Sequence, residues 1–167
     1  MEVATLRGGS GAAWLDWRGE RIPCAIGRGG VPAHKVEGDG GTPAGTLTLR
    51  RVLYRADRIS VPATRLPRVP IGPDDGWCDD VHDSSYNRPV RLPHVGRHER
   101  LWRDDGLYDL LAVLGWNDAP VVPGRGSAIF LHVATADLAP TEGCVALLLP
   151  VLRQLLQAGL GAIEVER

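Results

Sequence analysis

Glycine and proline interrupt this chain at short intervals along almost its whole length. The 167 residues include 21 Gly and 13 Pro, and both residue types form turns and weaken or end regular secondary structure. The apolar runs between them are therefore short. This pattern is typical of many short strands joined by turns rather than of long helices. The sequence predicts a mainly β fold.

Several segments have the composition of strands. The clearest is Gly45–Tyr54, in which Thr46-Leu47-Thr48-Leu49 alternates so that the two leucines share one face of the strand. The other expected strands are Ala12–Trp17, Arg21–Gly27, Leu107–Leu114, Ala128–Ala134 and a closing strand at Ala162–Glu166.

One helix is expected between the last two of these strands. Its apolar face is formed by Leu148, Val151, Leu152, Leu155 and Leu156. This spacing places the five side chains on one side of a helix. Pro150 suits the first helical turn, and Gly159 suits a position just past the end.

The segment from Pro62 to Gly106 is rich in Pro, Asp and Arg and has little periodicity. Two interpretations stay open for it: a surface loop, or a long excursion that lines a substrate site, as long loops often do. The length of the chain fits a single domain over residues 1–167. We see no internal repeat.

Charge and cysteine content exclude several classes of protein. With 19 Lys and Arg against 20 Asp and Glu the net charge is −1, so the basic surface of a nucleic-acid-binding protein is absent.

The three cysteines, Cys24, Cys78 and Cys144, are odd in number and widely spaced, which predicts neither a disulfide framework nor a zinc site. His94 and His98 lie in a segment with the composition of a loop, and no metal is expected there.

The N-terminal residues 1–20 contain no apolar core of signal-peptide length, and no window approaches the roughly 18 apolar residues of a membrane helix. We therefore expect no transmembrane segment.

A histidine and a cysteine near the C-terminus are the best indication of function. His132 ends the apolar run Ile129-Phe130-Leu131, and Cys144 follows it by 12 residues. A cysteine is a strong nucleophile only as its thiolate, and a histidine beside it can remove the proton. Gly143 lets the backbone come close to a substrate, so that backbone N–H groups can bind an oxyanion. The alternative is a hydrogen-bonded core histidine and a buried structural cysteine.

The segment from His132 to Leu147 resembles the active-site motif of L,D-transpeptidases of the YkuD type. In that motif a histidine on a strand precedes the signature Ser/Thr-x-Gly-Cys-hydrophobic. Thr141, Gly143, Cys144 and Val145 fit it position by position.

Further segments are similar to a compact subgroup of the same family, so that the resemblance covers about residues 20 to 167. They are His34–Gly45, Asp75–Asp80, Tyr86-Asn87, Glu99–Trp102 and Tyr108-Asp109.

The resemblance implies a compact mixed-sheet β-sandwich with one or two helices, and a cysteine peptidyltransferase that acts on peptidoglycan stem peptides. Cys144 would form a thioester with a donor stem, His132 would transfer protons, and backbone N–H groups near Gly143 and Cys144 would bind the oxyanion. Thr141 would either orient His132 or the thiol, or act only as a turn residue. No cofactor is implied, and we expect a monomer.

The resemblance also implies a periplasmic or cell-envelope location. Because no signal peptide is visible, a cytoplasmic location is the alternative.

Polar and aromatic residues of the resembling segments are candidates for contact with the substrate, with a structural role as the alternative for each. They are Lys35, Glu37, Asp39, Trp77, Tyr86, Asn87, Glu99, Arg103, Tyr108 and Asn117.

The chain departs from the larger family at two positions. Val133 replaces the usual Gly after the histidine, and Ala146 replaces the usual Arg or Asn two residues after the cysteine. The loop between His132 and Cys144 is also short. We therefore expect an open site without a lid, and either 1→3 or 3→3 cross-links. An L,D-carboxypeptidase or amidase, and a non-catalytic envelope-binding module, are the alternative functions.

Overall fold

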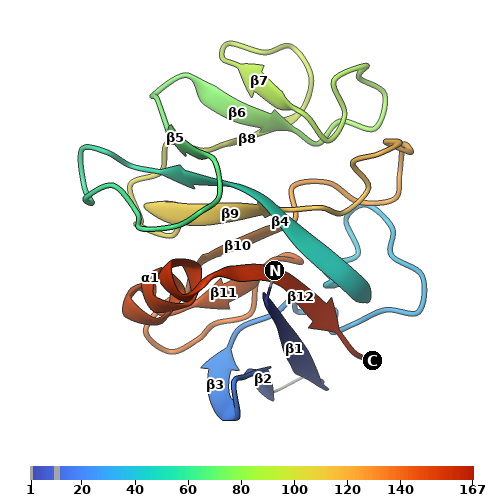
Figure 1. Ribbon diagram of the computed structural model, residues 1–167. Helices are drawn as coiled ribbons and strands as arrows, with labels where there is room; N and C mark the ends of the chain where they lie inside the picture. The colour runs from blue at the N-terminus through green and yellow to red at the C-terminus, as the bar shows by residue number, and fades with distance from the viewer. Residues whose placement is uncertain (1, 10–11) are drawn as a thin grey trace.

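The long strand β4 (Gly45–Tyr54) belongs to two layers of strands in the computed structural model, which describes residues 2–9 and 12–167 (Figure 1). Its first half pairs with β12 (Leu160–Val165) and its second half with β9 (Leu110–Leu114), with an irregularity between Leu49 and Arg51. The other strands of the path are β1 (Glu2–Gly9), β2 (Ala12–Trp17), β3 (Glu20–Cys24), β10 (Phe130–Val133) and β11 (Val145–Leu147).

The strand order is β11-β10-β9-β4-β12-β1-β2-β3, with β5 (Arg68–Pro70) beside β4. The sheet is mixed, because β1 with β12, β10 with β11 and β4 with β5 are parallel pairs. The two ends of the path also meet. Just after β3, Ala25 exchanges two backbone hydrogen bonds of 2.9 Å with Ala146 of β11.

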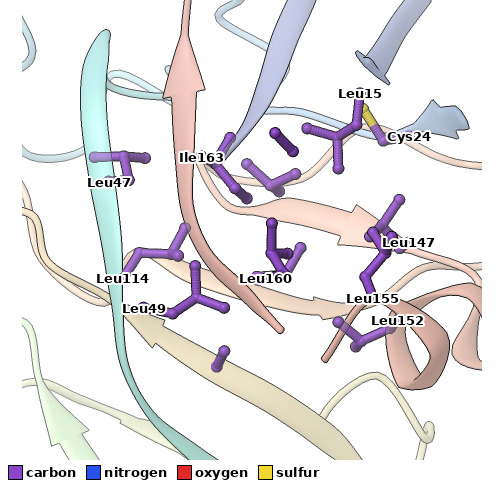
Figure 2. Close-up of a cluster of buried hydrophobic side chains, with 14 of the residues drawn as sticks. Leu15, Cys24, Leu47, Leu49, Leu114, Leu147, Leu152, Leu155, Leu160 and Ile163 are labelled. Carbon is purple, nitrogen blue, oxygen red and sulfur yellow. The ribbon is translucent and has the colours of Figure 1, made fainter. Parts of the chain in front are cut away.

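Leucine side chains from both halves of the path fill the space between them. Figure 2 shows Leu15 near Cys24 at one side of this core, Leu47 and Leu49 on β4, and Leu160 and Ile163 on β12. All are less than 5 % exposed. Burial of such side chains contributes roughly 1.5–3 kcal/mol each, so this layer is the main stabilising element.

The single described helix, α1 (Leu149–Ala158), packs beside β12 and buries Leu152, Leu155 and Leu156. Gly159 ends it in the left-handed conformation with φ of 99°, and its N–H faces the carbonyls of Leu155 and Leu156. Glycine adopts this conformation without the steric cost that other residues have. Leu148, which the spacing placed on the apolar face, is the residue before the helix and is 41 % exposed.

A small outer sheet lies within the segment from Pro62 to Gly106 that had little periodicity. Its order is β7 (Pro89–Arg91), β6 (Asp75–Cys78) and β8 (His98–Arg100), and it lies above β4 and β9 in Figure 1. A second apolar cluster, which includes Trp77, Tyr108 and Phe130, joins this sheet to β9 and β10. The outer sheet therefore has a fixed position beside these strands.

The prediction of a mainly β fold with a mixed sheet and one helix is confirmed. The expected strand Arg21–Gly27 is too long, because the chain leaves the ladder after Cys24 and bridges to Ala146 and Thr141 instead. The strands β1, β5 to β8 and β11 were not predicted from the sequence. Among the described residues, no helix is long and apolar enough to cross a membrane.

Four glycines allow two loops to touch the turn before β11. A Cβ atom on Gly27 would lie 2.2 Å from the carbonyl oxygen of Gly40 and 2.9 Å from the Cα atom of Gly143. A Cβ atom on Gly41 would lie 2.5 Å from Pro32. No side chain fits at Gly27, where the backbones themselves are packed together, whereas Gly41 packs against the Pro32 ring.

We expect Gly27→Ala to destabilise the protein. The added methyl group meets backbone atoms that cannot move aside, so the free energy of unfolding should fall by about 1–3 kcal/mol or more in urea denaturation. Gly9→Ala is the matched control, because a Cβ atom on Gly9 meets nothing within 4 Å. Equal stability of the two variants would contradict the packing described for Gly27.

Candidate active site

The parallel pairing of β10 with β11 places His132 and Cys144 on the same face of the sheet. Leu131 lies opposite Val145, and His132 lies opposite Ala146. Side chains alternate between faces along a strand. Cys144, directly before β11, therefore shares a face with His132, and both line the same cleft.

The thiol of Cys144 is held by two backbone groups. The Phe130 N–H donates to Sγ at 3.3 Å, and the thiol donates to the Ala128 carbonyl at 3.3 Å. Ala128 has φ of 53°, a left-handed conformation that alanine rarely adopts. Its N–H donates to Oδ1 of Asn87 at 3.1 Å, which helps to keep its carbonyl directed at the thiol.

Cys144 is only 8 % exposed and lies at the base of the cleft. Burial, together with the nearby Glu99 carboxylate, raises the pKa of the thiol to about 12. The Phe130 N–H, Lys35 and Arg103 act in the opposite direction, but they do not outweigh burial. At neutral pH the resting protein therefore carries a neutral thiol, and a base must remove its proton.

His132 has the properties of such a base. Its Nδ1 lies 2.8 Å from the Val133 carbonyl. A carbonyl only accepts hydrogen bonds, so Nδ1 carries the proton and Nε2 keeps its lone pair. Burial lowers the pKa of His132, and the Arg103 cation adds to this effect. The imidazole is therefore neutral at pH 7. The ring of Tyr108 packs edge-on against it, with centroids 5.3 Å apart.

Thr141 shapes the turn that carries the cysteine. Its hydroxyl donates to the Cys144 carbonyl at 2.7 Å and accepts from the Gly143 N–H at 3.1 Å. These are the bonds of a turn residue, and neither reaches His132 or the thiol. Gly143 has φ of 139°, and a Cβ atom there would lie 2.9 Å from the Gly41 carbonyl oxygen. Only glycine fits this position.

The cleft above the two residues has a volume of about 640 Å³ and is lined by both acidic and basic side chains. Its cations are Arg28, Lys35, Arg97 and Arg103, and its carboxylates are Glu37, Asp79, Glu99 and Glu142. Several of them pair with each other: Arg28 with Glu142 at 2.8 Å, and Arg97 with Asp79 at 3.0 Å. The cleft therefore suits a ligand that carries both charges.

Glu99, Arg103 and Tyr108 form one wall of the cleft. The Tyr108 hydroxyl donates to Glu99 at 2.5 Å, and the Arg103 guanidinium lies 4.9 Å from the centre of the Tyr108 ring. Burial raises the pKa of Glu99, although Tyr108 and Arg103 oppose this. Arg103 also pairs with Asp105.

Lys35 and Glu37 also line the cleft and come from the loop before β4. The Lys35 ammonium lies 2.6 Å from Asp39, which it shares with two backbone N–H groups. Although burial opposes it, these contacts hold the pKa of Asp39 below its usual value. Glu37 accepts hydrogen bonds from the hydroxyls of Tyr86 and Ser127.

Five of the candidate substrate residues do not line the cleft: Asp39, Trp77, Tyr86, Asn87 and Asn117. Their polar groups bond to the protein itself. Asn87 accepts from Trp77 and donates to the carbonyls of Trp116 and Asn117. The Asn117 amide in turn bonds to Val122 and Gly126. These residues hold the loop that ends at Ala128, behind the thiol.

Seven polar lining residues were not predicted: Arg28, Asp79, Arg97, His98, Ser127, Thr135 and Glu142. Glu142 occupies the variable position of the signature, between Thr141 and Gly143, so the motif could have indicated that it lies at the site. The others come from loops or short strands whose position depends on the tertiary fold.

At the two departures from the larger family, the chain has small or apolar side chains. Ala146 is 1 % exposed and packs with Ala25 and Ala134. The short loop after His132 contributes Thr135, Ala139 and Pro140 to the lining of the cleft.

Comparison with protein families agrees with this geometry. Residues 10–158 match the family model described as the L,D-transpeptidase catalytic domain, YkuD. A comparison with curated proteins finds no match. The match spans most of the chain and includes His132 and the turn that carries Cys144, and the chain therefore belongs to the L,D-transpeptidase catalytic-domain family.

Proposed function

We propose that this protein is a peptidoglycan L,D-transpeptidase that joins stem peptides through a thioester on Cys144. One observation carries the proposal: a neutral imidazole whose Nδ1 faces the Val133 carbonyl and a thiol held by backbone bonds line one cleft, on one face of a parallel strand pair. This arrangement supplies a base and a nucleophile for acyl transfer.

In the first step, His132 Nε2 removes the proton of the Cys144 thiol as the sulfur attacks a carbonyl carbon of the donor stem. The oxygen of the tetrahedral intermediate becomes negative, and the Cys144 N–H is the backbone donor that we assign to it. The Gly143 N–H already donates to Thr141, so it would have to exchange this bond to take part. When the intermediate collapses, His132 returns the proton to the leaving amine, and the thioester remains.

In the second step, an amine of the acceptor stem attacks the thioester. His132 takes a proton from the amine and returns it to the sulfur, which restores the thiol. The protein needs no cofactor for either step. If water attacks instead, the product is a trimmed stem, as in an L,D-carboxypeptidase.

The mixed charges of the cleft support a stem peptide as the substrate. A diaminopimelate residue presents an ammonium and carboxylates, and arginine binds carboxylates through two parallel hydrogen bonds. Glu99 is well placed for the acceptor amine, because its carboxylate is close enough to Cys144 to raise the pKa of the thiol. Arg28 and Arg103 are the corresponding candidates for stem carboxylates.

We further propose that position 146 does not select a stem carboxylate, since Ala146 carries no group that could bind one and packs against Ala25 and Ala134. Both 1→3 and 3→3 cross-links are compatible with this site. The substrate lies outside the cytoplasmic membrane, so this function requires a location in the cell envelope.

Cys144→Ala should abolish product formation from purified muropeptides, because no other described thiol lines the cleft. Its stability should change by less than about 1–2 kcal/mol. The matched control is Cys24→Ala, which removes a buried thiol of the core and should keep its activity. Mass spectrometry of the products distinguishes cross-linked from trimmed stems. Cross-links formed by Cys144→Ala would refute the proposed nucleophile.

Activity should persist to unusually low pH. Because burial lowers the pKa of His132, the acid limb of kcat/KM should have its midpoint below the usual histidine value of about 6.5. Arg103→Gln removes a cation that lowers this pKa and leaves Asp105, which raises it, so the midpoint should move to higher pH. The measurement compares the midpoint pH of the acid limb in the two proteins and does not depend on the maximal value of kcat/KM. An acid limb that stays in place or moves to lower pH would contradict the assignment of His132 as the base.

A further inference from the structure

Three side chains with different metal-binding atoms meet at the end of the outer sheet. They are Cys78 at the end of β6, Asp83 in the loop after it, and His94 in the loop between β7 and β8. One sulfur, one carboxylate oxygen and one imidazole nitrogen lie within 4.8 Å of one another. Residues that are 16 positions apart along the chain are thus brought to one point.

The carboxylate and the imidazole of this cluster lie close together. Asp83 uses Oδ1 to accept the Ser85 N–H at 2.7 Å, and its Oδ2 lies 3.0 Å from His94 Nε2. His94 Nε2 is buried, and with the residues that the structure describes it forms no hydrogen bond of acceptable geometry. Its polar neighbour is therefore Asp83 Oδ2, in a geometry that a metal ion between the two atoms would improve.

The backbone leaves space for this cluster at Gly96. A Cβ atom there would lie 2.5 Å from Asp83 Oδ2 and 3.2 Å from His94 Nε2. Any side chain at this position would therefore push into the point where the ligand atoms meet.

We propose that Cys78, Asp83 and His94 bind a Zn²⁺ ion. Sulfur, nitrogen and oxygen ligands together are typical of zinc, whereas Ca²⁺ and Mg²⁺ bind oxygen alone. In a tetrahedral zinc site the ligand atoms are roughly 3.3–3.8 Å apart, given bond lengths of 2.0–2.3 Å. Small side-chain movements bring the three atoms to this spacing, and a water molecule completes the tetrahedron.

The same three residue types also form catalytic triads, but here the thiol is not accessible to a substrate. Cys78 is fully buried and lies outside the cleft. The ion is therefore structural. It joins the end of β6 to the two loops beside it.

Such an ion would also steady one wall of the cleft. Asp79 follows Cys78 directly, and His98 lies opposite Cys78 in the β6–β8 pairing; both line the cleft, as does Glu99. The carboxylates of Asp79 and Asp80 lie close to the cluster and favour a cation, with Arg97 paired to Asp79.

This proposal departs from the sequence-based expectation that no metal is bound. The spacing of residues 78, 83 and 94 matches no common zinc motif, and His94 was considered only together with His98. The three residues come together only in the folded outer sheet, so their positions in the sequence alone do not indicate a metal site.

The test uses the full chain in a Cys144→Ala background, so that Cys144 and His132 cannot hold a metal. The chelated protein is titrated with Co²⁺, whose thiolate charge-transfer band reports a sulfur ligand, and then with Zn²⁺ in calorimetry. We expect one ion per chain, the thiolate band, and a higher Tm with Zn²⁺.

Cys78→Ser should remove the band, and Asp83→Asn, His94→Gln and Gly96→Ala should each weaken Zn²⁺ binding by at least about tenfold. Cys24→Ala, which removes another buried thiol, should bind as before. Far-ultraviolet circular dichroism checks that each variant is folded, and if Cys78→Ser does not fold, the other three variants carry the test. Absence of the band in the folded parent, or equal Zn²⁺ affinity in parent and variants, would overturn the proposal.

Discussion

The pairing of β10 with β11 is the constraint on which the rest of the site depends. It is a short parallel pair, and it lies at one end of a long path of strands. The Ala25–Ala146 hydrogen bonds fix β11 from its other side, so this strand is not a free edge. The register of the β10–β11 pair decides whether Cys144 and His132 lie on the same face of the sheet. A shift of one residue would turn Cys144 to the opposite face from His132, and the close glycine contacts at Gly27 and Gly143 oppose such a shift.

The same burial that fixes the thiol also determines how it can react. Two backbone groups hold the sulfur, and the low exposure of the site raises the pKa of Cys144 far above neutrality. Burial acts on His132 in the opposite sense and keeps the imidazole neutral. Both effects favour a neutral thiol and imidazole at rest over a thiolate–imidazolium pair. The nucleophile is then formed only when His132 removes the proton during attack, which limits reaction of the thiol with other electrophiles.

Part of this molecule could be predicted from its sequence, and the remainder depends on contacts between distant segments. The alternation in β4 and the leucine spacing of α1 are local patterns, and both elements lie close to their predicted bounds. Strands β5 to β8 have only three or four residues each, too few for a periodic pattern.

At the site, His132 and Cys144 could be predicted because they lie in one local motif. Asn87 and Asn117 were considered as substrate ligands, but their amides bond to backbone groups of the loop behind the thiol. Arg97 reaches the cleft only because the outer sheet places it there.

The central claim is that Cys144 carries the acyl group, and the most direct measurement is to find that group on the protein. The enzyme is mixed briefly with a donor stem peptide and no acceptor, quenched in acid and digested, and the peptides are analysed by mass spectrometry. The account predicts a thioester on the peptide that contains Cys144, with the mass of the donor stem less its leaving residue. It also predicts that hydroxylamine removes this group. A stem peptide attached through Cys24, Cys78 or any residue other than Cys144, or no adduct while product accumulates, would contradict it.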